Sequence, residues 1–220
     1  MPGREPFRDR AQAGAALAER LASRADVPGT VVLALPRGGV PVAAPVAARL
    51  HAPLDVLVVR KLGVPTQPEL AMGALAGIAG DVVTVLHERV LRAARIPPSV
   101  LESVRAAELA ELHRREQAYR RDLPALEVAG RTAVVVDDGA ATGSTVLAAI
   151  RALRRRGVGQ VVVGLPVCPP DTAAALEREA DELVCLRVPA GFEAVGLEYA
   201  RFAPPADAEV RALLLSSRAP

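Results

Sequence analysis

The sequence "AVVVDDGAATGST", residues 133–145, joins four apolar residues to two adjacent acids and then to a loop of small residues. An apolar run of this kind is typical of a strand that is covered on both faces, as in parallel sheets. Two neighbouring carboxylates repel each other, so a buried strand that ends in both of them indicates a requirement outside the chain. The stretch therefore predicts a buried strand that leads into a binding site.

Similar apolar runs recur along the chain and alternate with Ala-rich stretches that have helical spacing. This alternation predicts an α/β fold, with a mainly parallel sheet of five or six strands flanked by helices and joined by right-handed crossovers. We expect Ser144 or Thr145 to cap the helix that follows the quoted stretch. The expected strands cover residues 30–36, 54–60, 81–86, 131–138, 160–167 and 182–186, and the expected helices cover 40–51, 144–157 and 169–180.

Two segments stand outside this alternation. Residues 88–123 form a long, charged helical stretch, interrupted by Pro97 and Pro98, that exceeds an ordinary crossover. Residues 187–220 follow the last expected strand and contain Phe192, Tyr199 and Phe202. We predict a single domain over residues 1–220, with a small hood lobe built from the 88–123 insertion and the 187–220 tail.

The composition excludes several classes of protein. The formal net charge is only +2, from 27 basic and 25 acidic residues, so nucleic acid is not an expected partner. Cys168 and Cys185 have no metal-ligand or redox spacing and are expected to be reduced core residues. The N-terminus lacks the apolar stretch of a signal peptide, and no run has the length of a membrane span. We therefore expect a soluble, cytoplasmic protein without a membrane partner.

The small-residue loop suits the phosphate group of a ligand, and the two acids suit its sugar. The loop leaves backbone N–H groups at a helix N-terminus, where anions bind, and its hydroxyl side chains add donors. Asp137 and Asp138 can accept hydrogen bonds from sugar hydroxyls or hold hydrated Mg²⁺, which together predicts a ribose 5-phosphate site. The alternative is a turn in which the acids only cap the next helix. The predicted phosphate-binding residues are Gly139, Ala140, Ala141, Thr142, Gly143, Ser144 and Thr145.

The thirteen-residue stretch resembles the phosphoribosyl-pyrophosphate (PRPP) binding motif of type I phosphoribosyltransferases. Other stretches extend the resemblance to bacterial proteins with this domain over nearly the whole chain. "LPRGGVPVA" (35–43) is similar to the pyrophosphate loop, and "RKLGVPTQPELAMGA" (60–74) lies where the family has a mobile catalytic loop. "RREQAYR" (114–120) and "VPAGFEAVGLEYARF" (188–202) complete the signature.

The resemblance implies roles for residues that match its motifs. Arg37, Gly38 and Gly39 would bind the diphosphate, with a non-proline cis peptide at Arg37–Gly38. Lys61 would arrive with a mobile loop formed by residues 58–77, whose prolines and glycines favour an excursion over a helix. Asp137 and Asp138 would hold the ribose hydroxyls and the shell of a Mg²⁺ cofactor. Lys61, Arg37, Asp137 and Asp138 are thus the expected catalytic residues.

The implied activity is transfer of the 5-phosphoribosyl group from PRPP to a nitrogenous base, with release of pyrophosphate. Phe192 and Tyr199 are candidates to stack on the base, and the alternative is that they pack the tail onto the body. Ala141 stands where hypoxanthine-guanine enzymes carry a base-contacting carboxylate, so the resemblance does not identify the acceptor. A non-catalytic PRPP- or nucleotide-sensing regulator is the alternative function, and a homo-oligomer is compatible with either.

Overall fold

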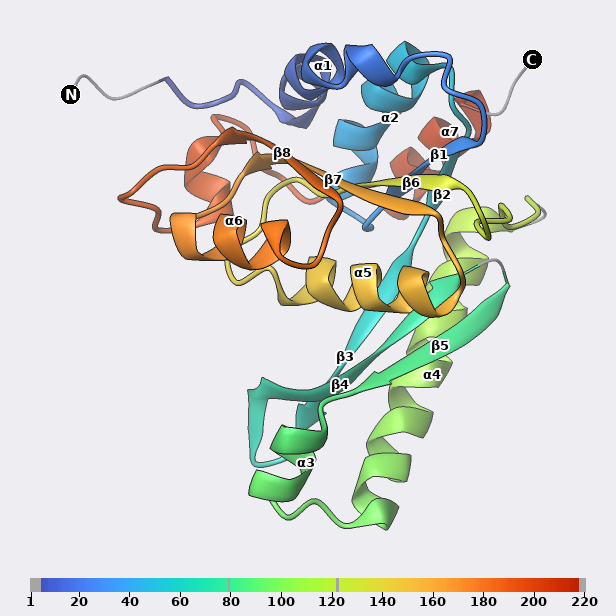
Figure 1. Cartoon of the computed structure of the whole chain (residues 1–220), viewed down its shortest axis with the longest axis vertical. Helices are drawn as coiled ribbons and strands as arrows, with labels where there is room; N and C mark the ends of the chain where they lie inside the picture. Colours follow the sequence, from blue (N-terminus) through green and yellow to red (C-terminus); the bar gives the residue numbers. More distant parts are fainter. Residues whose placement is uncertain (1–4, 79, 122, 218–220) are drawn as a thin grey trace.

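The computed structural model describes residues 5–78, 80–121 and 123–217, and a five-stranded parallel sheet forms its main body (Figure 1). The strand order is β2-β1-β6-β7-β8, and all four neighbouring pairs are parallel. The predicted α/β fold with a parallel sheet is therefore confirmed. The strands are β1 (Thr30–Ala34), β2 (Leu54–Val56), β6 (Thr132–Val136), β7 (Gln160–Val167) and β8 (Glu182–Arg187).

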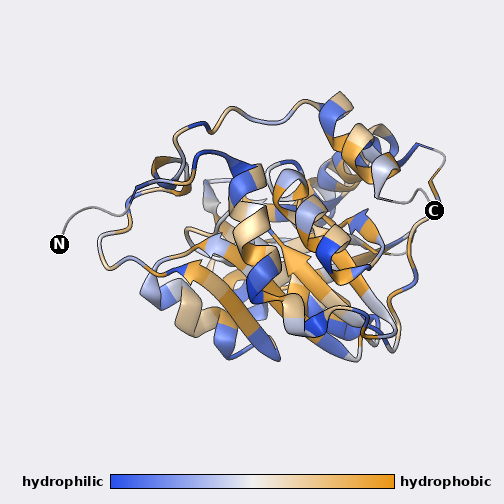
Figure 2. Ribbon diagram, turned by 90° about the horizontal axis from the view of Figure 1, so that it is seen from above, coloured by the Kyte–Doolittle hydropathy of each residue, from blue (hydrophilic) through white to orange (hydrophobic). Residues whose placement is uncertain are grey.

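Helices cover both faces of this sheet. Val134 and Val136 of β6 join a buried cluster with Leu17, whereas Val135 joins a second buried cluster with Ile150. This alternation is what the period of two in a strand requires when both faces are buried. Figure 2 shows apolar strands beneath helices whose outer faces are polar. The first face is covered by α1 (Arg10–Arg20) and α2 (Gly39–Leu50), the second by α5 (Ser144–Arg155) and α6 (Pro170–Glu177), and a short 3₁₀ turn, η1 (Ala22–Arg24), follows α1.

The segment from residue 58 to residue 86 departs from the expectation. It forms a separate antiparallel sheet of β3 (Val58–Val64), β4 (Gln67–Ile78) and β5 (Asp81–Leu86). The segment forms no helix, as expected, but it is not an irregular loop, because Pro65 and Thr66 alone make the turn and the flanking residues pair as strands. Residues 81–86 form a strand as expected, but outside the parallel sheet.

The expected helical insertion is present as α3 (Glu88–Ala93) and α4 (Pro98–Arg120), and Pro98 is the first residue of α4. Buried Leu112 packs α4 against β3 and β4. The Arg120 guanidinium pairs with the Asp55 carboxylate at 2.9 Å, and both side chains are buried. Together with β3, β4 and β5, the two helices form one unit between β2 and β6, which lies beside the main sheet in Figure 1. This unit is larger than the predicted insertion.

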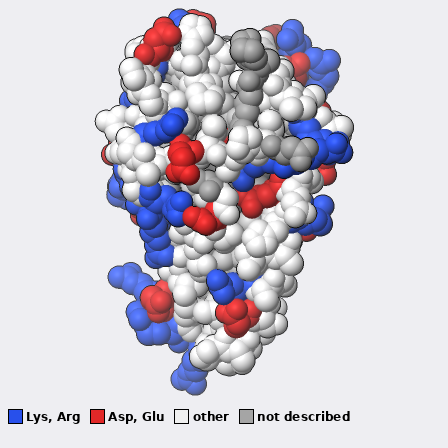
Figure 3. All heavy atoms as spheres, turned by 90° about the vertical axis from the view of Figure 1, so that its right-hand side faces the viewer, with Lys and Arg blue, Asp and Glu red and all other residues white. Residues whose placement is uncertain are grey.

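The tail after β8 packs against the N-terminal segment and against α2 and α4. Phe7 forms a bridge with Tyr199, so the segment around η2 (Val195–Glu198) lies along the N-terminal segment. The last helix, α7 (Asp207–Ser216), packs on α2 and α4. The face of the molecule that carries α4 displays acids and bases side by side (Figure 3). On α4 itself, Glu111 pairs with Arg114 and Arg115. Within the described ranges, no helix is both long enough and apolar enough to cross a membrane.

Candidate functional site

The acid pair lies at the carboxyl edge of the sheet, directly after its central strand β6. The predicted pyrophosphate loop contacts it from the neighbouring strand. A Cβ atom added to Gly39 would lie 2.6 Å from the carbonyl oxygen of Val136, and one added to Gly38 would collide with the Asp138 carboxylate. Only glycine fits this approach. The structure thus brings Gly38 and Gly39 together with Asp137 and Asp138.

The small-residue loop leads directly into α5. Gly143 precedes the helix with a φ of 68°, a left-handed conformation that glycine adopts without strain. Ser144 and Thr145 are the first residues of α5, so the prediction that one of them caps the helix is wrong. The N-cap residue Gly143 has no side chain to cap this N-terminus, but the Ser144 N–H donates to Thr142 Oγ1 at 3.4 Å, and the Thr142 and Ser144 hydroxyls lie 3.1 Å apart. The other N–H groups of the first turn and the positive end of the helix dipole are therefore available to an anion.

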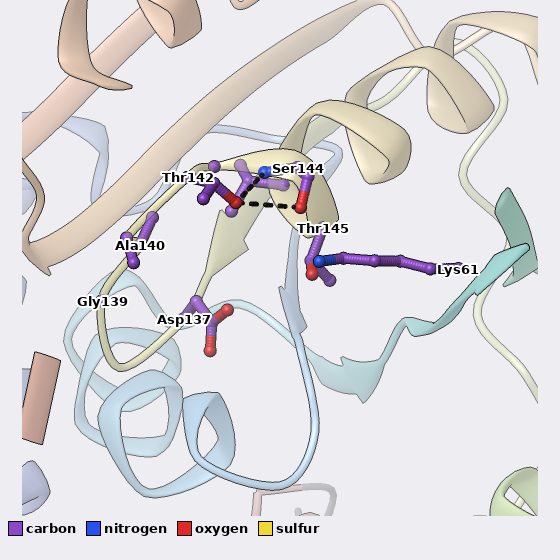
Figure 4. Close-up of a pocket in the computed structure, with 10 residues that line it drawn as sticks. Lys61, Asp137, Gly139, Ala140, Thr142, Ser144 and Thr145 are labelled. Carbon is purple, nitrogen blue, oxygen red and sulfur yellow. Dashed lines mark hydrogen bonds between the residues drawn. The ribbon is translucent and has the colours of Figure 1, made fainter. Parts of the chain in front are cut away.

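A cavity of about 210 Å³ lies in front of this loop (Figure 4). Lys61 reaches it from β3, and Figure 4 shows its side chain extending toward Thr145. The predicted cation, acid and phosphate-loop residues therefore meet although Lys61 lies in a strand and not in a loop. The lining residues are Lys61, Asp137, Gly139, Ala140, Ala141, Thr142, Gly143, Ser144, Thr145 and Val146.

The two acids differ in their surroundings. Burial, followed by the charge of Asp138, raises the pKa of Asp137 well above its ordinary value. The Asp138 N–H donates to Asp137 Oδ1 at 2.9 Å. Burial also raises the pKa of Asp138, but a hydrogen bond and the charge of Arg10 oppose this effect. Asp137 thus keeps its proton to a higher pH than a surface aspartate, which limits the negative charge beside the phosphate loop.

Arg10 is the residue of this region that sequence reasoning missed. Its Nε donates to Asp138 Oδ2 at 2.8 Å, and its Nη1 donates to the carbonyl oxygen of Ala203, also at 2.8 Å. Its guanidinium carbon lies 3.9 Å from the centroid of the Phe202 ring. The side chain is 9% exposed, and its acidic partner is 128 residues away in sequence. The only signal was an arginine at the start of the Ala-rich helix 10–20, which is too common a pattern to single out.

Arg37 is placed differently from the other expected site residues. It is exposed and lies 3.6 Å from Asp207 at the start of α7, and it is not among the described residues that line the cavity. The predicted position of the cis peptide is also wrong, because the cis bond is Pro36–Arg37, one bond before Arg37–Gly38. The two glycines mark the close approach to the acids and not the position of the cis bond.

The two aromatic candidates for base stacking differ in exposure. Tyr199 is only 5% exposed, and its ring centroid lies 5.0 Å from that of Phe202 and 5.7 Å from that of Phe7. Its hydroxyl donates to the carbonyl oxygen of Asp138 at 2.6 Å. These contacts leave Tyr199 no open face for a base and make it a support for the acid pair. Phe192, between β8 and η2, is partly exposed and remains the candidate for stacking on a base.

The donor set suits a magnesium ion that is held mainly through its ligand. In the part of the chain that the structure describes, no group of three His, Cys, Asp or Glu side chains could hold a metal ion by itself. Asp137 lines the cavity, whereas Asp138 is engaged by Arg10. Mg²⁺ commonly takes one or two carboxylates together with water and substrate phosphates, and Asp137 is the carboxylate that faces the cavity here.

A parallel sheet with a helix N-terminus and an acid pair at its carboxyl edge is the architecture of α/β proteins that bind phosphorylated ligands. The sequence match gives the family. Residues 8–199 match the phosphoribosyl transferase domain family, and the chain belongs to this family.

The relatives agree with this assignment. Two Mycobacterium tuberculosis proteins, "Putative phosphoribosyl transferase Rv0571c" of strain H37Rv and "Putative phosphoribosyl transferase MT0597" of strain CDC 1551, are each 49% identical over 208 residues. The match covers 94% of this chain but 46% of each relative, so the chain spans about half the length of these proteins. The crystal structure of TT1426 from Thermus thermophilus is 44% identical, with a TM-score of 0.84 over 96% of this chain and 98% of that one.

Proposed function

We propose that this chain binds PRPP and Mg²⁺ and transfers the 5-phosphoribosyl group to a nitrogenous base, releasing pyrophosphate. The observation that carries the proposal is the cavity in which the N-terminus of α5, the Lys61 ammonium and the half-buried Asp137 meet. Phosphate, diphosphate and ribose are the three parts of PRPP, and this cavity edge offers a partner for each. Membership of the phosphoribosyl transferase domain family supports the same assignment.

In the proposed reaction, residues 139–145 bind the 5-phosphate through backbone N–H groups and hydroxyls. Asp137 and Asp138 accept hydrogen bonds from the ribose hydroxyls, and Lys61 and the Gly38–Gly39 loop face the diphosphate. The bond from the anomeric carbon to the diphosphate oxygen breaks, its electron pair leaves with pyrophosphate, and a bond to the acceptor nitrogen forms. Fixing both ends of the sugar while neutralising the leaving group lowers the barrier.

Two further parts of the proposal concern charge at the leaving group. Mg²⁺, bound beside Asp137, would supply positive charge to the diphosphate oxygens. Arg37 would join it only after exchanging Asp207 for the diphosphate, because the two side chains are paired in the ligand-free chain. Both side chains are partly exposed, so this exchange requires no unfolding of the body.

The test is incubation with PRPP, Mg²⁺ and a panel of bases, with pyrophosphate release and product mass as readouts. We expect turnover with one class of base, and a loss of PRPP affinity in Asp137→Asn by calorimetry. Asp81→Asn is the matched control, because Asp81 is an exposed acid in β5 that pairs with Arg156 away from the cavity. Equal PRPP affinity of the two variants would contradict the proposed role of Asp137.

A PRPP- or nucleotide-sensing regulator is the second candidate function. The observation that favours it is the conversion of the expected catalytic loop into the paired strands β3 and β4, which limits how far Lys61 can move. Tight PRPP binding with no pyrophosphate release from any base would support the sensor. Turnover with any base would exclude it.

We further propose that the described chain acts as one domain, in which α4 and α7 form the hood. The supporting contacts are those of α7 with α2 and α4. We propose the cytoplasm as its compartment, because both cysteines are free thiols.

A further inference from the structure

The two cysteines, which lie far apart in sequence, meet behind the phosphate loop. Cys168 follows β7 directly and is fully buried, and Cys185 lies in the neighbouring strand β8 and is partly exposed. Their sulfur atoms are 3.4 Å apart, within hydrogen-bond distance for two thiols. A disulfide bond brings two sulfurs to about 2 Å, so its formation requires the two sulfurs to approach each other by more than about 1 Å.

The two thiols are chemically unequal. The hydrogen bond between them lowers the pKa of Cys185 and, together with burial, raises the pKa of Cys168. The thiolate is the form that reacts with oxidants, and Cys185 is also the partly exposed residue of the pair. Cys185 is therefore the attacking thiol, and Cys168 is positioned to resolve the product.

A short and stiff path connects this pair to the phosphate loop. Cys168 is followed by Pro169 and Pro170, whose rings fix the backbone at the start of α6. Two residues later, the Thr172 hydroxyl donates to the carbonyl oxygen of Ala141 at 2.6 Å. A Cβ atom on Gly143 would lie 2.9 Å from Thr172 Cγ2, so α6 also packs directly on the residue before α5. A displacement of Cys168 thus reaches the loop through three intervening residues.

We propose that Cys168 and Cys185 form a reversible disulfide that loosens the phosphate loop and weakens anion binding there. A peroxide oxidises Cys185 to a sulfenic acid and is itself reduced to water. The Cys168 thiol then attacks this sulfur, an S–S bond forms and a second water leaves, so that two thiols lose two electrons and two protons in total. A dithiol reductant restores both thiols.

The effect on PRPP rests on the proposed function, whereas disulfide formation and its effect on the loop do not. The first experiment treats the full chain with stoichiometric hydrogen peroxide, alkylates the remaining thiols after unfolding and measures the intact mass. We expect the wild type to lose about 2 Da and to take up no alkylating agent. In Cys168→Ser, Cys185 should be trapped as a sulfenic acid by dimedone, and in Cys185→Ser the buried thiol should stay reduced. Two alkylated thiols in treated wild type would overturn the proposal, as would disulfides between chains on a non-reducing gel.

The second experiment measures hydrogen exchange of the amides in residues 139–147 before and after oxidation, without any ligand. We expect faster exchange in the oxidised wild type, reversal by dithiothreitol, and no response to peroxide in the Cys168→Ser/Cys185→Ser double variant. Unchanged exchange in a fully disulfide-bonded chain would overturn the coupling to the loop. If the reduced chain binds PRPP, we expect oxidation to weaken that binding about tenfold, which is within the usual range for coupled sites. Absence of PRPP binding by the reduced chain would contradict the proposed function only.

Discussion

Replacing Arg10 by methionine is the sharpest test of how the acid pair is held. Methionine keeps much of the length and the contact with Phe202 but removes the hydrogen bonds to Asp138 and Ala203. The Arg10 and Asp138 side chains are 9% and 15% exposed, so the variant leaves a mostly buried carboxylate beside Asp137 without its counter-charge. Breaking a buried pair by removing one partner costs about 3–5 kcal/mol.

For a chain of this length, each kcal/mol shifts Tm by about 2–4 °C, so we expect Arg10→Met to melt about 6–20 °C below wild type at pH 7.5. The matched control is Arg8→Met, because Arg8 pairs with Asp9 at the surface with 66% of its side chain exposed. Such pairs contribute little, and we expect the control to shift Tm by at most about 2 °C.

The pH dependence supplies a second readout. Removal of Arg10 takes away the group that opposes the raised pKa of Asp138, so in the variant this carboxyl protonates at a higher pH than in wild type. A carboxyl with a raised pKa destabilises the fold above that pKa, and the cost disappears as it protonates. The Tm difference from wild type should therefore shrink on acidification. Arg10→Met/Asp138→Asn should recover part of the loss, because no unpaired charge is left.

Equal Tm values for Arg10→Met and Arg8→Met would show that Arg10 does not stabilise the acid pair. Additive effects of Arg10→Met and Asp138→Asn would show the same. The Arg10–Asp138 ion pair also changes an expectation drawn from the sequence. Two adjacent acids suggest that replacing either one is neutral or stabilising in the empty protein. Because Asp138 has Arg10 as a partner, only Asp137 is expected to behave in that way.

Asp137→Asn should raise Tm of the ligand-free chain at pH 8, since the pKa of Asp137 is raised by burial. This gain in Tm should vanish as the pH falls and the wild-type carboxyl protonates, and differential scanning fluorimetry from pH 8 to 5 measures both effects. Arg120→Met should lower the free energy of unfolding in urea by about 3–5 kcal/mol, because the buried Asp55 carboxylate loses its guanidinium partner. A loss no larger than that of a surface substitution would contradict the role of this ion pair in holding α4 to the body. Lys61→Met should weaken PRPP binding about tenfold or more, the value of one charge-assisted hydrogen bond, and calorimetry that finds no change would remove Lys61 from the site. Since Lys61 is paired in β3 and Leu62 is buried, a lysine-specific protease should cut the folded chain only when this sheet opens, and rapid cleavage would contradict the pairing.

The parts of the site that the sequence predicts are local. The strand β6, the acids, the loop and α5 follow one another without a gap, so their order along the chain fixes their order in space. Gly38 and Gly39 at the start of α2 are equally predictable, because β1 and β6 are neighbours and the chain after β1 must approach the acids.

The parts that failed depend on distant partners. Residues 58–77 carry prolines and glycines that suggest a loop, yet backbone pairing with β5 and packing on α4 make them strands. Arg10 and Tyr199 come from opposite ends of the chain, and nothing near either residue indicates that both reach Asp138. Local propensity describes a segment alone, whereas these contacts exist only once the sheet has formed.

The strand order has a consequence for synthesis on the ribosome. β1 ends at Ala34, and its neighbour β6 begins at Thr132. About a hundred residues must therefore be translated after β1 before it can pair with β6. The antiparallel unit of β3, β4 and β5 needs only neighbouring segments and can form while the chain is still being made. Until β6 emerges, one edge of β1, whose five residues are all buried in the folded chain, has no neighbour and is open to strands of other nascent chains. Chains that terminate before β6 are thus expected to aggregate, and chaperones that shield β1 during translation would raise the yield of this protein.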